Sequence, residues 1–508
     1  MSDQVELRIA SGTLVLSASQ LVALLLGVAF SVVIARLLGP EDYGLVGVSL
    51  MYPTMIVSIL DLGMGNVLIK FTSVSNPRRD LYAWSSIGLR SVLGFIGFTL
   101  TYALADVFAQ LLARPYIADY IRVLSVYVLA LSVLNTLGQI FIGLGRFRIA
   151  GSINIAQYVA KGVVAVYLVL LGWGVFGVAV SYSFAYALLC ALYFALFLKT
   201  SRKPAFSKTA LLDIISLAFP LYLASLAGLV VGPIVGTVLA QHASNYDIGN
   251  YNVGSTTLSP INVLMYSITA SVLSLLPVIE DKVELRNRVA VLVVYSSLIL
   301  TFLIGGYTAV LSPLVRILYG SGYRDAATYA LLLAIGHIVN AVLTGGVLGG
   351  YFIVTGFTKW NSIAGVIGAL STLVSALVLI PLFKASGAAL SYTIGLAASA
   401  TVMHIVARKE FSINVSLVSL TKAIIPVIAG IVASQAVLRY FKSSVLLDFV
   451  TSGTVYTVVY LAILPLLVDK STIENIVEFS SKLAYIGFVI RSLGYLYLRL
   501  LGLLSKLL

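Results

Sequence analysis

The sequence alternates long apolar stretches with short polar segments along most of its length. A helix needs about 20 predominantly apolar residues to cross the hydrocarbon core of a membrane, and measured against that length the chain contains about fourteen candidate spans. They lie at residues 12–35, 45–69, 82–105, 119–143, 150–171, 175–198, 213–239, 251–276, 289–311, 327–353, 360–381, 386–407, 422–440 and 446–468. A spanning segment of this length satisfies its backbone hydrogen bonds as a helix. We therefore expect an all-α membrane protein.

The distribution of charge agrees with that fold class. Charged residues make up 10% of the 508 residues and hydrophobic residues 60%, whereas soluble proteins carry about 25% charged residues. The formal net charge is +13, but the basic residues lie in short loops between spans, so we expect no nucleic-acid partner. One set of alternate loops holds about twice as many basic residues as the other, which predicts cytoplasmic N- and C-termini and residence in the cell membrane.

Two parts of the chain resemble each other in sequence. The segment Phe141-Ile-Gly-Leu-Gly145-Arg-Phe precedes a span and then Gly177-Val-Ala-Val-Ser181-Tyr182, and a similar series begins at Phe352 and ends at Ser391-Tyr392. The copies are about 210 residues apart, which predicts two parallel six-helix repeats. We expect an N-terminal lobe at 1–205, a C-terminal lobe at 206–412 and two additional spans at 413–470.

The last segment, 471–508, carries basic residues at Arg491, Arg499 and Lys506. At 3.6 residues per turn these three lie on one side of a helix. A cytoplasmic amphipathic helix at the membrane surface accounts for them better than a fifteenth span, which would bury two arginines in lipid. We expect this helix to anchor the chain.

The sequence offers no pattern typical of catalysis or of a bound cofactor. It lacks the glycine-rich P-loop that binds ATP phosphates, and no loop is long enough to form a catalytic domain. Its single cysteine is Cys190, and its three histidines are far apart in sequence, so we predict no metal site and no cofactor. A transporter without ATPase motifs takes its energy from an ion gradient, the membrane potential or consumption of the substrate.

Lys161 is the most informative residue, because a charge at the bilayer centre costs at least ~2.5–3.5 kcal/mol. It lies near the middle of the predicted span 150–171, too deep for its side chain to reach the interface. Asn154 and Gln157 precede it on the same helix face. These three residues predict a polar stripe that faces a water-filled lumen. The alternative is a structural lysine paired with a neighbouring carboxylate.

Three further charged residues lie in or at the ends of the first spans. Asp61 is a candidate site for a coupling cation or proton, or else the partner of Lys161 or Arg90. Arg90 lies two turns into its span, and we expect its side chain to extend to the cytoplasmic interface, although it also remains a candidate for the lumen. Arg36 ends the first span and either faces the mouth of the cavity or anchors the helix.

His337 is a second candidate for ion coupling, because a histidine titrates near neutral pH, although a lone histidine is more often structural. Asp61, Arg90 and Lys161 all lie in the first half of the chain, and the repeat places about Thr372 at the position of Lys161. We therefore expect a lopsided, cationic lumen. Such a lumen suits a phosphate-bearing substrate, since lysine binds phosphate as a point charge.

Two motifs resemble a known family. Ile34-Ala-Arg36-Leu-Leu-Gly39-Pro40-Glu41-Asp42-Tyr43-Gly44-Leu45, followed by Leu60-Asp61-Leu62-Gly63-Met64-Gly65, is similar to the start of polysaccharide transporters. These are the lipid-linked oligosaccharide (O-antigen-type) flippases of the multidrug/oligosaccharidyl-lipid/polysaccharide exporter superfamily. The resemblance implies alternating access and a cationic cavity that binds a polyprenyl phosphate or pyrophosphate carrying sugars, with Arg36 at the family's typical arginine.

We therefore predict a flippase, not an enzyme, that moves a lipid-linked oligosaccharide across the cytoplasmic membrane for glycan biosynthesis. Its expected partners are that substrate, the membrane lipids and a coupling cation (H+ or Na+), and we expect a monomer. The alternative on the same fold is a cation-coupled exporter of drugs or metabolites. A membrane glycosyltransferase or polymerase is disfavoured, because no loop offers a carboxylate base.

Overall fold

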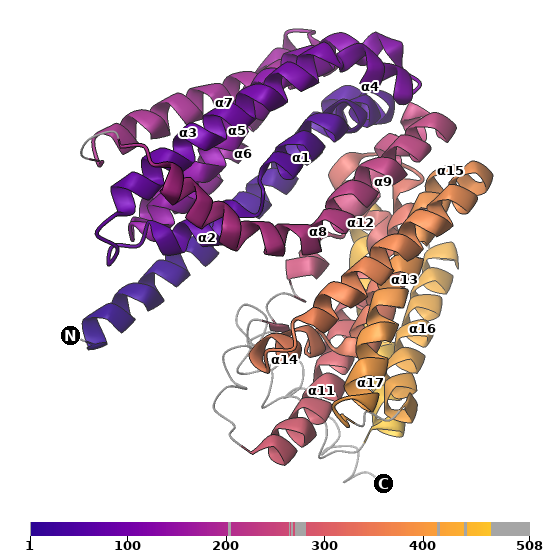
Figure 1. The fold of residues 1–508 in the computed structure, drawn as a ribbon. Coiled ribbons are helices and arrows are strands. Elements are labelled where there is room, and N and C mark those ends of the chain that lie inside the picture. The colour runs from indigo at the N-terminus through magenta and orange to yellow at the C-terminus, as the bar shows by residue number, and fades with distance from the viewer. Residues whose placement is uncertain are drawn as a thin grey trace. The chain divides into compact units, whose positions relative to one another are not determined.

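The structure is a computed structural model that describes residues 2–201, 205–263, 265, 268, 269, 281–413, 417–440 and 444–468. The predicted C-terminal helix at 471–508 lies outside these residues. The chain divides into two compact units, Met1–Asn252 and Val253–Leu508 (Figure 1). The predicted lobe boundary at 205/206 concerns the sequence repeat and remains a prediction. The compact units divide later because the helix that follows residue 206 packs on the first unit.

The described part of the first unit is helical throughout. Its elements are α1 (Ser2–Leu60), α2 (Met64–Phe71), α3 (Arg79–Ala103), α4 (Ala105–Leu111), the 3-10 helix η1 (Pro115–Ile117), α5 (Ala118–Gly143), α6 (Phe147–Leu170), α7 (Gly174–Leu198) and α8 (Lys208–His242), and α9 (Asn245–Thr257) crosses the boundary. Helix α5 is central, because it packs against α1, α2, α3, α6 and α7. Its Leu124, Leu134, Leu137 and Phe141 are completely buried.

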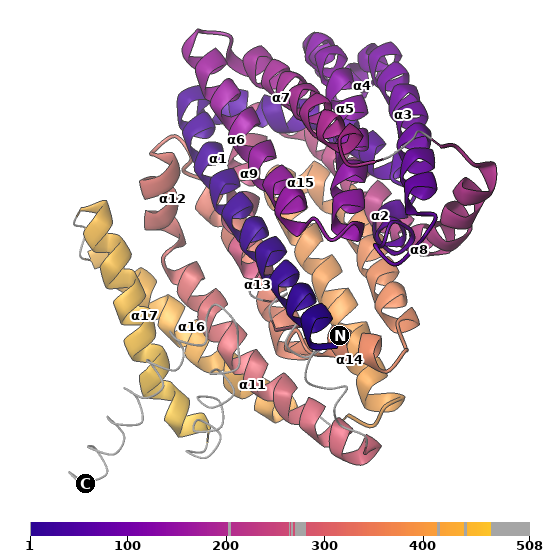
Figure 2. The ribbon, with the colours of Figure 1, turned by 90° about the vertical axis from the view of Figure 1, so that its left-hand side faces the viewer.

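The second unit is also helical wherever it is described. It contains α11 (Lys282–Ala309), α12 (Leu311–Tyr319), α13 (Ala326–Thr344), α14 (Leu348–Val354), α15 (Lys359–Lys409), α16 (Leu417–Tyr440) and α17 (Val445–Leu467). Helices α16 and α17 pair with each other and lie along α11 (Figure 2). Tyr456 of α17 fills the space above Gly305 and Gly430 and donates a hydrogen bond to the carbonyl of Phe302 at 3.0 Å.

Ten helices of the described residues are long and apolar enough to cross a membrane. This is fewer than the predicted fourteen spans partly because α15 contains two predicted spans, and α1 contains the first predicted span and most of the second, 45–69, whose end lies in α2. At 1.5 Å per residue, either helix would be about 80 Å long if straight, far more than the ~30 Å of hydrocarbon. Each is interrupted by a residue with non-helical dihedral angles, Gly39 in α1 and Lys384 in α15.

The chain changes direction at both interruptions. In α1, the hydroxyls of Ser31 and Tyr43 are hydrogen-bonded at 2.7 Å, although a straight helix would hold residues twelve apart about 18 Å apart along its axis. In α15, a side chain at Gly387 would collide with the carbonyl of Leu379, eight residues earlier. Of the two remaining predicted spans, 213–239 corresponds to α8, whose apolar part is Gly228–His242, and 251–276 falls partly outside the described residues.

Two glycines in similar sequence positions, Gly44 in Asp42-Tyr43-Gly44 and Gly249 in Asp247-Ile248-Gly249, lie against each other. Gly44 of α1 and Gly249 of α9 approach so closely that a β-carbon on Gly44 would lie 2.9 Å from the backbone nitrogen of Gly249. A β-carbon on Gly249 would collide with the carbonyl of Pro40. Small residues allow helix backbones to pack this closely in membranes. The contact between equivalent positions supports the proposal of two related halves.

Candidate functional site

Lys161 lies on α6 between two tyrosine rings. Its ammonium nitrogen is 4.4 Å from the ring centre of Tyr158 and 4.9 Å from that of Tyr182 on α7. These distances are within the range of cation–π attraction, which contributes about 0.5–2 kcal/mol per contact. The side chain is half-buried, so part of its hydration is replaced by aromatic faces.

A second layer of tyrosines supports this arrangement. Tyr127 of α5 packs edge-on against Tyr182 and Tyr186, with ring centres 5.6 and 5.0 Å apart. Tyr127 and Tyr186 are each 5% exposed, and edge-to-face packing holds such rings in a defined geometry. The two layers together bring one lysine and four tyrosines from three helices into a single cluster, which we call the tyrosine cluster (Lys161, Tyr127, Tyr158, Tyr182 and Tyr186).

Helix α1 packs against α6 through glycines. A β-carbon on Gly27 would lie 2.7 Å from the ring of Tyr158, and one on Gly162 would overlap the ring of Phe30. The two glycines therefore allow aromatic side chains to lie between α1 and α6. Tyr158 keeps its position beside Lys161 because Gly27 leaves room for it.

The ion pairs of the described residues do not include Lys161. The predicted alternative, a structural lysine paired with a carboxylate, therefore finds no support in the part of the chain that the structure describes. Asn154 and Gln157 are half-buried on the same helix, and the hydrogen bonds between described residues involve neither side chain.

Asp61 is paired with Arg90, not with Lys161. The Arg90 guanidinium forms an ion pair with the Asp61 carboxylate and donates to the carbonyl of Leu60 at 2.5 Å and to the hydroxyl of Thr136 at 3.1 Å. Arg90 is 2% exposed. The expectation that its side chain extends to the cytoplasmic interface is therefore wrong, because the end of α1 and helix α5 offer it acceptors inside the protein.

This ion pair lies where the chain leaves α1 and enters α2. Leu62 and Gly63 have φ angles of 50° and 67°, the left-handed conformation that ends a helix. The last carbonyls of a helix lack intrahelical partners, and Arg90 binds that of Leu60. The Leu-Asp-Leu-Gly motif is thus a break between two helices that Arg90 stabilises from α3.

The remaining predicted residues lie elsewhere. Arg36 is exposed on α1, nine residues beyond Gly27, and the structure gives it an interaction of its own. His337 lies on α13 in the second unit, is 4% exposed and has its ring centre 6.1 Å from that of Tyr392. Its Nδ1 is buried and lacks a hydrogen-bond partner among the described residues.

A buried arginine outside the spans was not predicted as important. Arg114 precedes η1 and donates to the carbonyls of Ala240 and Ala243 at 2.5 and 3.0 Å, and to the Asn245 side chain at 2.5 Å. Burial lowers the pKa of its guanidinium, although arginine stays protonated at neutral pH. The positive charge of Arg114 lies at the C-terminal end of α8, where the helix dipole favours a cation. Arg114 therefore links the end of α8 to the connection between α4 and α5.

Comparison with known proteins identifies the family. A search of curated proteins finds no match. The sequence profile described as polysaccharide biosynthesis protein matches residues 9–282, more than half of the chain. The chain belongs to this family.

Solved structures with the same fold agree with that assignment. Lipid II flippase MurJ, in an inward closed conformation, matches with a TM-score of 0.69 at 15% identity, over 89% of this chain and 98% of that one. A multidrug resistance MATE family transporter in its inward-facing conformation matches with a TM-score of 0.60 at 17% identity, over 79% and 96%. A MOP superfamily transporter from Pyrococcus furiosus gives 0.55 at 16% identity, over 79% and 95%. At these identities the matches establish the fold, which is that of the MOP superfamily.

The predicted family resemblance is confirmed. The chain is a polysaccharide biosynthesis protein with the fold of the MOP superfamily, which MurJ and MATE transporters share. The tyrosines around Lys161 are the residues that sequence reasoning missed. Tyr182 belongs to the repeated Gly-x-x-x-Ser-Tyr motif, and Tyr186 follows it by four residues, which places both on one helix face. Aromatic residues in an apolar span are most often part of the core, so this signal was not distinctive.

Proposed function

We propose that this polysaccharide biosynthesis protein translocates a polyprenyl-phosphate- or pyrophosphate-linked oligosaccharide across the cytoplasmic membrane by alternating access. The observation that carries the proposal is Lys161, a cation within a membrane span that contacts tyrosine rings and no carboxylate of the described residues. In a medium of low dielectric constant, a cation without a counter-ion attracts an anion strongly. A phosphate group linked to a lipid supplies such an anion within the membrane.

The neighbouring polar residues suit the rest of this substrate. Asn154 and Gln157 offer amide donors and acceptors along α6, which sugar hydroxyls can use. In the second half of the chain, Thr372 occupies the position aligned with Lys161, and its hydroxyl donates to the carbonyl of Gly368 at 2.9 Å. The cation is therefore not duplicated, which agrees with a lopsided pathway. In this proposal the lobes 1–205 and 206–412 are the two moving halves, and both termini are cytoplasmic.

Coupling to H+ or Na+ involves Asp61 or His337. A cation that binds at Asp61 must displace the guanidinium of Arg90, which already forms an ion pair with it. The Nδ1 of His337 lacks a partner among the described residues, and a neutral imidazole nitrogen can accept a proton. We therefore propose His337 as the first residue to test for proton coupling. Arg36, at the end of the first part of α1, is proposed as a contact for the substrate at the mouth of the pathway.

A cation-coupled exporter of drugs or metabolites is the second candidate, because MATE family transporters share the fold. Lys161 opposes it for cationic compounds, since a buried positive charge repels them. The two functions predict different cargo, and a single assay distinguishes them.

The assay uses proteoliposomes that contain a fluorescent polyprenyl-pyrophosphate oligosaccharide or a cationic dye, with and without an imposed H+ or Na+ gradient. We expect movement of the lipid-linked oligosaccharide and none of the dye, and acceleration by one of the two gradients. Movement of the dye with no movement of the oligosaccharide would favour the exporter and rule out the flippase.

A further inference from the structure

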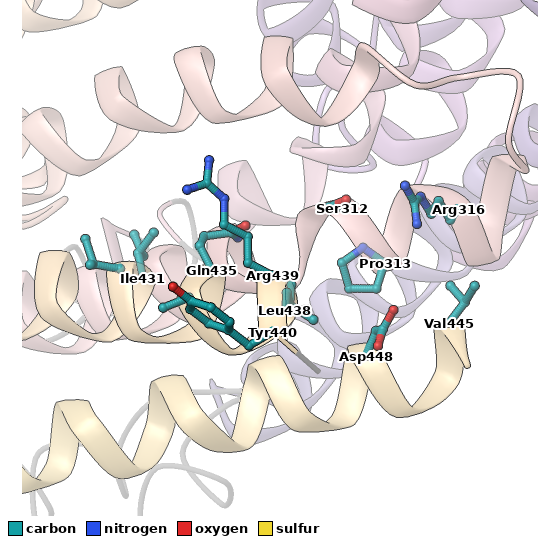
Figure 3. Close-up of a pocket in the computed structure, with 12 residues that line it drawn as sticks. Ser312, Pro313, Arg316, Ile431, Gln435, Leu438, Arg439, Tyr440, Val445 and Asp448 are labelled. Atoms are coloured by element: carbon teal, nitrogen blue, oxygen red, sulfur yellow. The ribbon is translucent and has the colours of Figure 1, made fainter. Parts of the chain in front are cut away.

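The second unit contains a cavity between α12, α16 and α17 (Figure 3). Its volume is about 760 Å³, within the range of about 300–1,000 Å³ that is typical of sites for small molecules. No residue of this cavity belongs to the tyrosine cluster. Its lining includes Pro313, Arg316, Val432, Arg439, Tyr440 and Asp448.

Three of the lining side chains are charged, and they come from three different helices. Figure 3 shows Arg316 beside Pro313 on α12, Arg439 near the end of α16, and Asp448 on α17. Two positive charges and one negative charge give the lining a net charge of +1. The ion pairs found between described residues include neither arginine, whereas Asp448 has an interaction of its own. Guanidinium groups bind phosphate oxygens with two parallel hydrogen bonds, which makes arginine suited to phosphates.

The cavity lies where two membrane helices end. Helix α16 ends at Tyr440, one residue after Arg439, and α17 begins at Val445. Both helices are apolar enough to cross a membrane. Basic and aromatic residues at the ends of such helices lie at the level of the lipid headgroups. The distribution of basic residues among the loops predicts that this end lies on the side of the membrane opposite to the cytoplasm.

Apolar side chains continue from the cavity along the outer faces of the two helices. Val432 is 62% exposed, Ile428 57% and Leu446 67%, and Tyr440 at the rim is 84% exposed. On a protein in water such a surface would be costly, but here lipid chains can cover it. A ligand that satisfies both parts of the site has an anionic head for the arginines and hydrocarbon chains for the helix faces.

We propose that this cavity binds the phosphodiester headgroup of a membrane phospholipid, with the phosphate between Arg316 and Arg439 and the acyl chains along α16 and α17. The single negative charge of a lipid such as phosphatidylglycerol complements the net charge of the lining. This inference does not depend on the cargo of the transporter, because the cavity is lined by α12, α16 and α17 and not by the tyrosine cluster.

The experiment measures lipid binding directly. Full-length protein is purified in a lipid-free detergent, phosphatidylglycerol is titrated in, and the bound lipid is counted by native mass spectrometry. We expect one tight phosphatidylglycerol on the wild type and at least tenfold weaker binding to the Arg316→Gln/Arg439→Gln variant, because the variant loses both charged donors to the phosphate. Arg324→Gln is the matched control. It removes the same charge from an exposed residue of the same unit that does not line the cavity.

Two further arms identify the ligand. A neutral diacylglycerol should bind at least tenfold more weakly than phosphatidylglycerol, and a short polyprenyl phosphate should not displace bound phosphatidylglycerol at equal concentration. Equal binding of phosphatidylglycerol to the wild type and the double variant would overturn the proposal, as would preferential binding of the polyprenyl phosphate. Arg316→Lys and Arg439→Lys keep the positive charge and lose only the paired hydrogen bonds of the guanidinium. Each of these variants should bind phosphatidylglycerol with an affinity between those of the wild type and the double variant. They test the proposal also in the case that the double variant folds poorly.

Discussion

Replacing Asp61 with asparagine should destabilise the first unit, because it leaves the Arg90 guanidinium buried without a counter-ion. Arg90 is 2% exposed, and arginine cannot escape the cost by losing its proton. Removing one partner of a buried ion pair costs about 3–5 kcal/mol. The Asp61 side chain is 38% exposed, so water reaches part of the site. We therefore expect a lower cost, about 2–3 kcal/mol.

Arg90→Gln should cost a similar amount, because the carbonyl of Leu60 and the Asp61 carboxylate both lose a charged donor. The free-energy costs of the two substitutions should not be additive. With both residues neutral, an amide pair replaces the ion pair, and the double variant should be about as stable as either single variant. The expected coupling energy is about 2–3 kcal/mol, at the upper end of values measured for residues in contact.

The assay is thermal unfolding in detergent of the wild type, the two single variants and the double variant. For a unit of this size, 1 kcal/mol shifts the midpoint by about 2–4 °C. Each of the three variants should therefore unfold about 5–10 °C below the wild type. A double variant whose shift equals the sum of the single shifts would show that Asp61 and Arg90 act independently. That result would refute the interpretation of the Leu-Asp-Leu-Gly break as stabilised by this pair.

Three other predictions follow from packing and hydrogen bonding. Gly27→Val should slow transport without preventing insertion, because it displaces Tyr158 from Lys161, whereas Gly228→Ala, which has open space around its α-carbon, should have no effect in the same flux assay. Tyr456→Ala should lower the free energy of unfolding of the second unit by about 3–5 kcal/mol, and a midpoint within 3 °C of the wild type would contradict this. Arg114→Gln should increase amide hydrogen exchange at the end of α8, and unchanged exchange there would show that its bonds to Ala240 and Ala243 contribute little.

The sequence predicts the spans well because length and apolarity are local properties. It identifies Lys161 for the same reason, since a lysine far from both ends of a span is conspicuous without any knowledge of its neighbours. The Gly39-Pro40 segment predicts an interruption, and the structure has one at Gly39. The glycine-proline pattern does not show that helical geometry resumes directly after Gly39. For this reason the sequence predicts two separate spans where the structure has one kinked helix, α1.

The partners of these residues could not be predicted in the same way. Arg90 binds groups 30 and 46 residues away in sequence, and only the packing of α1, α3 and α5 brings them together. The same is true of the tyrosine cluster, whose members come from α5, α6 and α7. The compact units divide after Asn252 because α8 packs on the first unit through hydrogen bonds such as Tyr222 to the carbonyl of Ile59 at 2.6 Å. A repeat in the sequence carries no information about that contact.

The most direct test of the proposed function is the flux of a polyprenyl-pyrophosphate oligosaccharide in proteoliposomes that contain the wild type, Lys161→Gln or Lys199→Gln. Lys199 lies at the exposed end of α7, so the control removes the same charge from the same lobe. Loss of one charged contact to phosphate, about 1.5–3 kcal/mol, predicts a decrease of at least tenfold for Lys161→Gln and wild-type flux for Lys199→Gln. Wild-type flux by Lys161→Gln would contradict the account, because the cation on which it rests would then have no part in transport.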